Sequence, residues 1–164
     1  MFEDVFLLLA IFLVSILAVY AYQAKKRQEE LEVYEARLSE AGIREIDLMD
    51  GVEFEQYLVV LFKKLGISSK GTQASNDFGA DLILEGQERV VVQAKRYRKN
   101  VGIKAVQEIN SARDYYGAKE AWVITNSFFT SQAITLAEAT GVKLIGRNEL
   151  VELILNAKNN NRVS

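Results

Sequence analysis

The stretch Asp81-Leu-Ile-Leu-Glu-Gly-Gln-Glu-Arg-Val-Val-Val-Gln-Ala-Lys95 decides the fold of this chain. Its three consecutive valines favour a β-strand, because β-branched residues are good strand formers and poor helix formers. A shorter apolar run, residues 82–84, precedes the valines, and Gly86 lies in the connection. Two apolar runs joined by a short glycine-containing segment predict a β-hairpin.

The hairpin brings chemically useful side chains to one face. Side chains alternate along a strand, so Gln93 and Lys95 share a face and Ala94 points the other way. A connection of odd length, such as residues 86–88, sets Asp81 directly opposite Gln93. A carboxylate, an amide oxygen and an ammonium group then converge on the solvent side.

These groups suit a hard cation and a phosphate. Magnesium binds through carboxylate and carbonyl oxygens and keeps several waters. Asp81, Gln93 and the main-chain carbonyl of Ala94 are therefore the predicted metal ligands, with Mn²⁺ as a plausible substitute. A divalent cation lowers the pKa of water, and Lys95 supplies positive charge and hydrogen bonds beside it. The alternative is a surface strand that simply ends in Gln-x-Lys.

Several segments resemble the Mrr-type restriction endonuclease domain of the PD-(D/E)xK nuclease superfamily. The resemblance extends over roughly residues 46–155, with its elements in order. It is carried by Met49-Asp-Gly-Val-Glu-Phe-Glu-Gln-Tyr57, Asp77-Phe-Gly-Ala-Asp81, Val92-Gln-Ala-Lys-Arg-Tyr97 and Val101-Gly-Ile-Lys-Ala-Val-Gln-Glu108.

The resemblance implies a restriction-endonuclease-like α/β fold, a mixed sheet flanked by helices. It also implies that Asp81, Gln93 and Lys95 form the catalytic core, with Gln93 where most of the superfamily has an acid. Glu55, in the first helix of the domain, is implied to reach the site. Gln107 matches a recurrent family glutamine, which we place among the nucleic-acid-binding residues.

Composition excludes several kinds of catalysis. The 164 residues contain no His and no Cys. Histidine general bases, His/Cys zinc sites and thiol nucleophiles are therefore excluded. Hydrolysis must rely on carboxylate, amide, lysine, hydroxyl or metal, and nothing indicates a small-molecule cofactor.

Residues 5–22 form an apolar stretch whose one clearly polar member is Ser15. As a helix it would span about 27 Å at roughly 1.5 Å per residue, close to a bilayer core of about 30 Å. Lys25-Lys-Arg27 follow it, so the positive-inside bias places the N-terminus outside and the rest in the cytoplasm. The prediction is a single-pass cell-membrane protein anchored in the lipid bilayer. A cleaved signal peptide and a buried core helix are the alternatives.

The expected organisation is an anchor at 1–24, a charged helix or linker at 25–48, a nuclease domain at 49–157 and a polar tail at 158–164. Within the linker, apolar residues at helical spacing form a narrow stripe: Leu31, Tyr34, Leu38 and Ala41. The stripe fits either a short coiled coil that pairs two copies or, preferably, a solvated helix resting an edge on the domain.

The domain begins with a helix signal, Asp50 followed three residues later by Glu53. The remaining patterns predict the order α-β-β-β-α-β-α-β-α. The elements are expected at helix 51–65, strands 67–72, 82–84 and 89–95, helix 106–116, strand 121–125, helix 130–140, strand 142–145 and a last helix from 148. Helices alternating with the later strands favour a mixed α/β sheet.

Basic residues concentrate beside the predicted catalytic strand. The segment 89–104 contains no acid and six basic residues: Arg89, Lys95, Arg96, Arg98, Lys99 and Lys104. Such a cluster attracts a phosphate backbone without reading sequence. We therefore expect Arg96, Arg98, Lys99 and Lys104 to bind DNA, although a solvated basic loop has the same composition. Tyr97 could stack on an unpaired base or simply pack.

Three functions follow from these features. The first is a membrane-anchored, magnesium-dependent DNA endonuclease of the restriction type, for which a homodimer is one arrangement. The second is a catalytically silent nucleic-acid-binding module held at the membrane. The third is a membrane protein whose domain docks a protein partner.

Overall fold

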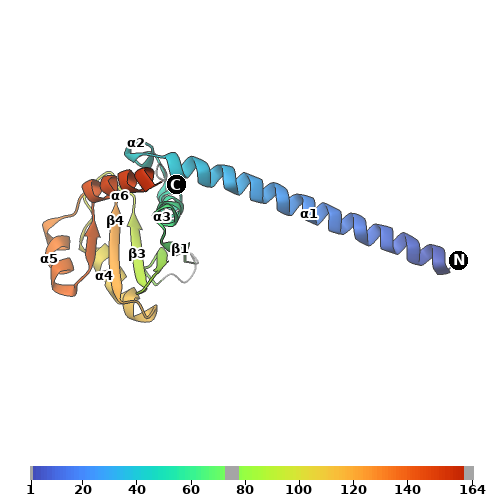
Figure 1. The fold of residues 1–164 in the computed structure, drawn as a ribbon. Helices are drawn as coiled ribbons and strands as arrows, with labels where there is room; N and C mark the ends of the chain where they lie inside the picture. Colours follow the sequence, from blue (N-terminus) through green and yellow to red (C-terminus); the bar gives the residue numbers. More distant parts are fainter. Residues whose placement is uncertain (1, 73–77, 161–164) are drawn as a thin grey trace. The chain divides into compact units, whose positions relative to one another are not determined.

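The computed structural model describes the backbone of residues 2–72 and 78–160 and the side chains of residues 11–72 and 78–160. The chain divides into two compact units, residues 1–37 and 38–164. The described residues of the first unit, 2–37, belong to helix α1, Phe2–Glu40, and the second unit contains the sheet (Figure 1). The last residues of α1, from Leu38, belong to the second unit.

The prediction of a membrane anchor is wrong. Among the residues whose side chains the structure describes, no helix is both long enough and apolar enough to cross a bilayer. The side chains of residues 5–10, which belong to the expected anchor, are not among those that the structure describes. The prediction of a single-pass membrane localisation is therefore also wrong, and contact with a bilayer is not supported.

Part of the apolar stripe in the linker packs within the second unit. Leu38 is 5% exposed and Ala41 is 8% exposed, whereas Leu31 remains 54% exposed. Lys64 Nζ donates to Ser39 O over 3.2 Å and pairs with Glu40 at 3.1 Å. Leu38 and Ala41 are therefore buried within the second unit, and both the coiled coil and the solvated helix of the linker stay predictions.

The second unit follows the predicted order of helices and strands. Asp50 caps α3, since its Oδ1 accepts from Glu53 N over 2.8 Å and Glu53 Oε2 accepts from Asp50 N over 3.1 Å. One short helix, α2, was not predicted, because four residues show no periodicity. The elements are α2 Ile43–Ile46, α3 Gly51–Lys64, β1 Ser68–Gly71, β2 Leu82–Glu85, β3 Val90–Lys95, α4 Ile103–Tyr115, β4 Glu120–Thr125, α5 Ser131–Thr140, β5 Lys143–Ile145 and α6 Arg147–Asn160.

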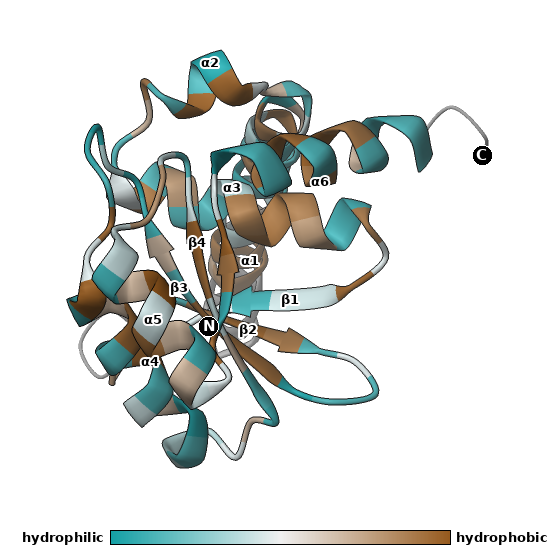
Figure 2. Ribbon diagram, turned by 90° about the vertical axis from the view of Figure 1, so that its left-hand side faces the viewer, coloured by the Kyte–Doolittle hydropathy of each residue, from teal (hydrophilic) through white to brown (hydrophobic). Residues whose placement is uncertain are grey.

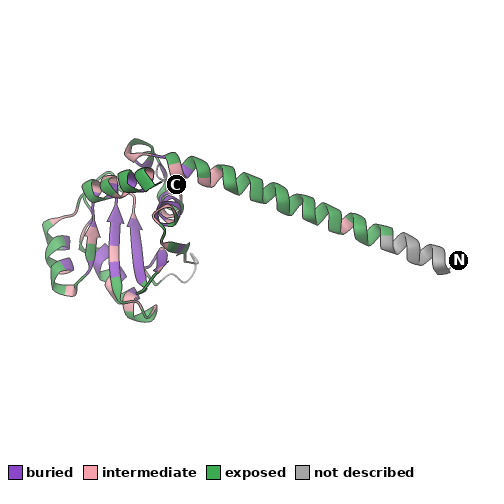
Figure 3. Ribbon diagram, in the orientation of Figure 1, coloured by how far each residue is buried: buried purple, intermediate pink, exposed green. Residues whose placement is uncertain are grey.

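The five strands form one mixed sheet in the order β1-β2-β3-β4-β5. The first two pairings are antiparallel, and β3-β4 and β4-β5 are parallel. Helices α4 and α5 lie on one face of the sheet and α3 and α6 on the other (Figure 2). Because both faces are covered, the central strands are almost entirely buried (Figure 3). This is the mixed α/β sheet that the sequence predicts.

The hairpin has the predicted register. Leu82 pairs with Val92 and Leu84 with Val90, so the same register places Asp81 opposite Gln93. Asp81 N donates to Val92 O over 2.8 Å, which continues the ladder to the start of the strand. Val91 belongs to the buried cluster that includes Val106 and Ile109 of α4. Alternation then directs Gln93 and Lys95 toward the α4 side of the sheet.

Candidate active site

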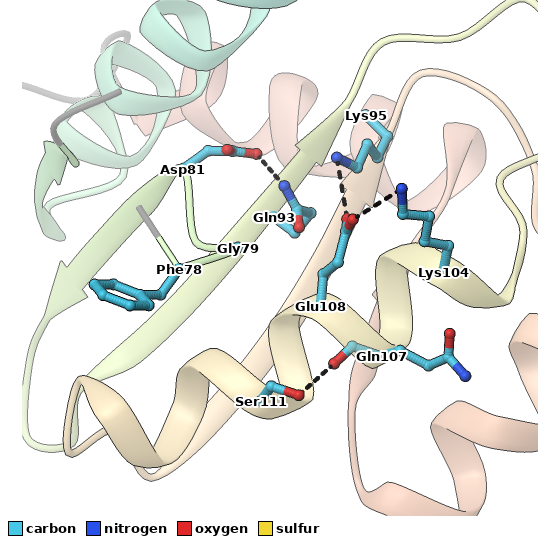
Figure 4. Close-up of a pocket in the computed structure, with 9 residues that line it drawn as sticks. All are labelled: Phe78, Gly79, Asp81, Gln93, Lys95, Lys104, Gln107, Glu108 and Ser111. Atoms are coloured by element: carbon cyan, nitrogen blue, oxygen red, sulfur yellow. Dashed lines mark hydrogen bonds and ion pairs between the residues drawn. The ribbon is translucent and has the colours of Figure 1, made fainter. Parts of the chain in front are cut away.

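A pocket of about 590 Å³ lies where the hairpin meets α4 (Figure 4). It is lined by Asp81, Gln93 and Lys95, the three side chains that the hairpin is predicted to bring together. Two further predicted residues, Lys104 and Gln107, also line it. The complete lining is Phe78, Gly79, Asp81, Gln93, Lys95, Lys104, Gln107, Glu108 and Ser111.

Two hydrogen bonds fix the carboxylate of Asp81. Its Oδ2 accepts from Gln93 Nε2 and from Ala94 N, each over 2.7 Å. Both donors belong to β3, so the carboxylate is tied to the strand that also carries Lys95. A carboxylate held by two donors at this length has a fixed orientation. The predicted convergence of the acid and the amide is therefore present.

The amide of Gln93 is only 3% exposed and is engaged on one side. Its Nε2 donates to Asp81, and its Oε1 is buried with no hydrogen-bond partner among the described residues. A buried acceptor left without a donor costs free energy unless water or a cation satisfies it. An unsatisfied oxygen beside a fixed carboxylate suits a hard cation, so these residues fit the predicted metal.

Lys95 pairs with an acid that the sequence did not single out. Its Nζ lies 3.6 Å from Glu108 Oε2, and Lys104 Nζ lies 3.7 Å from Glu108 Oε1. The Lys95 and Glu108 side chains are 21% and 33% exposed, so water screens the pair only in part. In the sequence, the spacing of four between Lys104 and Glu108 indicates that these two side chains are neighbours on a helix. That Glu108 faces Lys95 depended on how α4 packs on β3.

A strained turn brings Asp81 close to α4. Phe78 and Gly79 have φ angles of +43° and +90°, in the left-handed region. A Cβ on Gly79 would lie 3.0 Å from the backbone oxygen of Glu108, so no larger residue fits there without a shift. The ring of Phe78 packs on Tyr115 with centroids 4.0 Å apart. The turn and α4 therefore form one wall of the pocket.

Other predicted residues lie outside the pocket. Glu55 is half-buried on α3 and is not part of the lining. Arg96 is half-buried, and its Nε has no hydrogen-bond partner among the described residues. Arg98 and Lys99 are exposed in the loop after β3. Asp77, which is part of the motif before Asp81, lies outside the described residues. The sequence missed Phe78, Gly79, Glu108 and Ser111, which reach the pocket through the turn and α4.

The acidic content of the site is small. Within the residues that the structure describes, no group of three or more His, Cys, Asp or Glu side chains could hold a metal ion. The pocket contains two carboxylates, Asp81 and Glu108. Mg²⁺ tolerates such a site, because it is commonly bound through one or two carboxylates and keeps several waters.

Comparison with known proteins gives the same family as the sequence motifs. The model of a restriction endonuclease family, the Mrr catalytic domain, matches residues 46–154. The type IV methyl-directed restriction enzyme EcoKMrr of Escherichia coli (strain K12) is 36% identical over 86 residues, which cover 49% of this chain. The match spans only 28% of that enzyme.

Two solved structures share the fold. The DNA modification-dependent restriction endonuclease AspBHI superposes with a TM-score of 0.56 and 22% identity, over 77% of this chain and 36% of AspBHI. A protein of unknown function, AF1548, gives a TM-score of 0.54 and 21% identity, over 64% of this chain and 65% of AF1548. The second unit thus has the restriction-endonuclease-like fold.

Proposed function

Because the chain belongs to the restriction endonuclease family of Mrr catalytic domains, we propose that it is a metal-dependent DNA endonuclease that hydrolyses phosphodiester bonds. The observation that carries this proposal is the pocket in which Asp81, Gln93 and Lys95 meet. Membership of this family supports a nuclease of the restriction type. The cation, the catalytic residues and the substrate are proposals of ours.

Asp81, with Gln93 Oε1 and the Ala94 carbonyl, would hold the cation. Asp81 is already oriented by two donors, and the Gln93 oxygen lacks a partner that a cation would supply. Mg²⁺ or Mn²⁺ would neutralise charge on the phosphate and lower the pKa of water at the site. An amide oxygen is a weaker ligand than a carboxylate, so we expect the affinity for the metal to be modest.

Lys95 would bind the phosphate and orient the attacking water. Its ammonium is part-buried at the pocket, where positive charge stabilises the negative charge that develops on phosphate. Hydrolysis adds the water oxygen to phosphorus and breaks the bond to the leaving oxygen, which takes up a proton. The second carboxylate of the pocket is that of Glu108, which would hold Lys95 in place. Glu55, the acid that the family resemblance implies, does not line the pocket.

The basic residues near the pocket would hold the DNA backbone. Lys104 is 86% exposed and lines the pocket, and Arg98 and Lys99 are exposed in the neighbouring loop. These cations would bind phosphates of any sequence, so affinity should fall steeply as salt rises. Gln107, which also lines the pocket, adds a neutral donor for the backbone.

The test is cleavage of supercoiled plasmid by the full chain, with methylated and unmethylated plasmids compared. We expect nicking or linearisation with Mg²⁺ and none with EDTA, and we expect Asp81→Asn and Lys95→Ala to abolish it. Lys119→Ala, which removes an exposed lysine after α4, is the matched control and should cleave normally. Equal cleavage by the wild type and by the Asp81 and Lys95 variants would exclude this pocket as the catalytic site, and no cleavage by the wild type with Mg²⁺ would exclude the function.

A catalytically silent DNA-binding module is the second candidate. It is favoured by the glutamine at position 93, where most relatives in the superfamily have an acid. In that case the chain binds DNA in a salt-sensitive manner that does not depend on Mg²⁺, and no plasmid is cut. Binding and cleavage assays on the same preparation separate the two functions.

A further inference from the structure

A second pocket, of about 500 Å³, lies beyond the ends of β3 and β4. It is lined by Asp47, Leu48, Tyr97, Arg98, Asn100, Asn126, Ser127, Phe128 and Arg147. Three of these side chains are large, apolar and open to solvent: Leu48 is 83% exposed, Phe128 50% and Tyr97 44%. None of the nine residues belongs to the lining of the first pocket.

The floor of this pocket is a hydrogen-bonded network. Arg147 Nη1 and Nη2 donate to the two carboxylate oxygens of Asp47, each over 2.8 Å. Asn126 Nδ2 donates to Asp47 Oδ1 over 2.8 Å, and Asn126 Oδ1 accepts from Tyr97 N over 2.9 Å. The network therefore fixes the backbone from which the Tyr97 ring projects.

A second set of bonds fixes the backbone of Phe128. Val101 N donates to Phe128 O over 2.7 Å, and Thr130 N donates to Val101 O over 3.0 Å. The loop that carries Tyr97 is thereby held beside the loop that carries Phe128. Two exposed aromatic side chains on fixed backbone form a preorganised binding surface, because little conformational freedom is lost when a ligand binds.

The charge around these rings fits a polyanion. Arg98 lines the pocket, Lys99 follows it, and residues 89–104 contain no acid. The one acid of the lining, Asp47, is neutralised by its two bonds to Arg147. Aromatic rings that stack on bases, combined with cations that hold phosphates, are the means by which proteins bind unpaired nucleotides.

We propose that this pocket binds an unpaired nucleobase of the DNA, stacked against Tyr97 and Phe128, with its phosphates held by Arg98 and Lys99. This inference rests on the proposed function and adds a substrate class, DNA that is single-stranded or has a displaced base. Tyr97 is two residues beyond Lys95, so their Cα atoms are at most about 7 Å apart. The bound nucleotide therefore lies close to the phosphate at Lys95.

The test uses the full chain in EDTA, so that binding is measured without cleavage. The probe is a short single-stranded oligonucleotide containing 2-aminopurine, compared with the same sequence as a duplex. We expect quenched fluorescence on binding of the single strand, and Tyr97→Ala and Phe128→Ala to weaken that binding by roughly 5- to 100-fold. Duplex binding should change far less.

Two further variants separate stacking from folding. Phe128→Leu keeps an apolar side chain without a ring and should bind as weakly as Phe128→Ala, whereas Phe128→Trp should restore binding. Leu155→Ala removes an exposed apolar residue of α6, 55% exposed, and should bind like the wild type.

The outcomes distinguish this inference from the proposed function. Unchanged single-strand affinity in the Tyr97 and Phe128 variants, or equal losses for single strand and duplex, overturns the inference even if the wild type cleaves plasmid. A wild type that binds no DNA at low salt overturns the inference and the proposed function together. Metal-dependent cleavage that is lost in Asp81→Asn supports the function alone.

Discussion

Lys95 Nζ lies 3.6 Å from Glu108 Oε2, across the gap between β3 and α4. Glu108 stands on the same helix as Lys104, which it also contacts, at 3.7 Å. The carboxylate of Glu108 therefore joins a part-buried lysine of the pocket to an exposed one. It holds the Lys95 ammonium within the pocket that contains Asp81.

Glu108→Gln tests this role. The variant keeps the size of the side chain but removes the charge that orients Lys95, so we expect single-turnover plasmid cleavage to slow by about 5- to 20-fold. DNA affinity should be unchanged or slightly higher, because a negative charge has been removed from the pocket. Glu88→Gln, an equivalent change in the exposed hairpin loop, is the control. Equal cleavage rates in the two variants would refute the role of Glu108.

Gln93→Glu would place a second carboxylate beside Asp81, where 2.7 Å now separates Gln93 Nε2 from Asp81 Oδ2. Like charges at this distance raise the pKa of the pair and destabilise the metal-free protein by about 1–3 kcal/mol near neutral pH. Millimolar Mg²⁺ should offset the loss, because a ligand that binds the folded state raises its Tm. Thermal unfolding with Mg²⁺ and with EDTA measures both effects.

Gln87→Glu in the exposed connection is the matched control for that variant. It adds the same charge away from Asp81 and should respond to Mg²⁺ as the wild type does. If Mg²⁺ raises the Tm of Gln93→Glu no more than that of Gln87→Glu, the side chain at position 93 is not a metal ligand.

Gly79→Ala should destabilise the turn before Asp81. Gly79 has φ +90° and its Cβ would meet the backbone of Glu108 at 3.0 Å, whereas Gly66 has φ +80° and open space around it. Alanine at Gly66 therefore costs only backbone strain, about 1–2 kcal/mol. Alanine at Gly79 should cost measurably more in urea unfolding, because α4 must also move. Equal losses at the two positions would show that the contact with Glu108 has no energetic weight.

Asp47→Asn should lower stability in a pH-dependent manner. The bonds from the Arg147 guanidinium, with those from Asn126, hold the pKa of Asp47 below its usual value of 3.8. A lowered folded-state pKa stabilises the fold above the unfolded pKa, and this contribution is lost as pH falls through the folded value. Because the side chain is 36% exposed, we expect a loss of about 1–2 kcal/mol at pH 7, shrinking below about pH 4.

Urea unfolding at pH 7, 4 and 3 measures this difference for Asp47→Asn. Asp114→Asn is the control, since Asp114 is 92% exposed and its contact with Arg113 is long, at 3.9 Å. A stability difference between the wild type and Asp47→Asn that persists undiminished at pH 3 would contradict the assigned role of the ion pair.

The sequence alone determined the order of the elements in the domain and the register of the hairpin. Both follow from local rules: apolar periodicity, the Asp50 cap, and the alternation that places Asp81 opposite Gln93. The prediction of a membrane anchor at residues 5–22 rested on apolar content alone, and no helix among the described residues is long and apolar enough to cross a bilayer.

Tertiary packing decided which residues from distant elements share a pocket. Glu108 faces Lys95 because α4 packs on β3, at a distance set by Gly79. Asp47 meets Arg147 across 100 positions of chain because the start of α6 lies beside the residue that ends α2. No local pattern encodes such contacts, since they depend on how helices settle on a sheet and not on the period of any one segment.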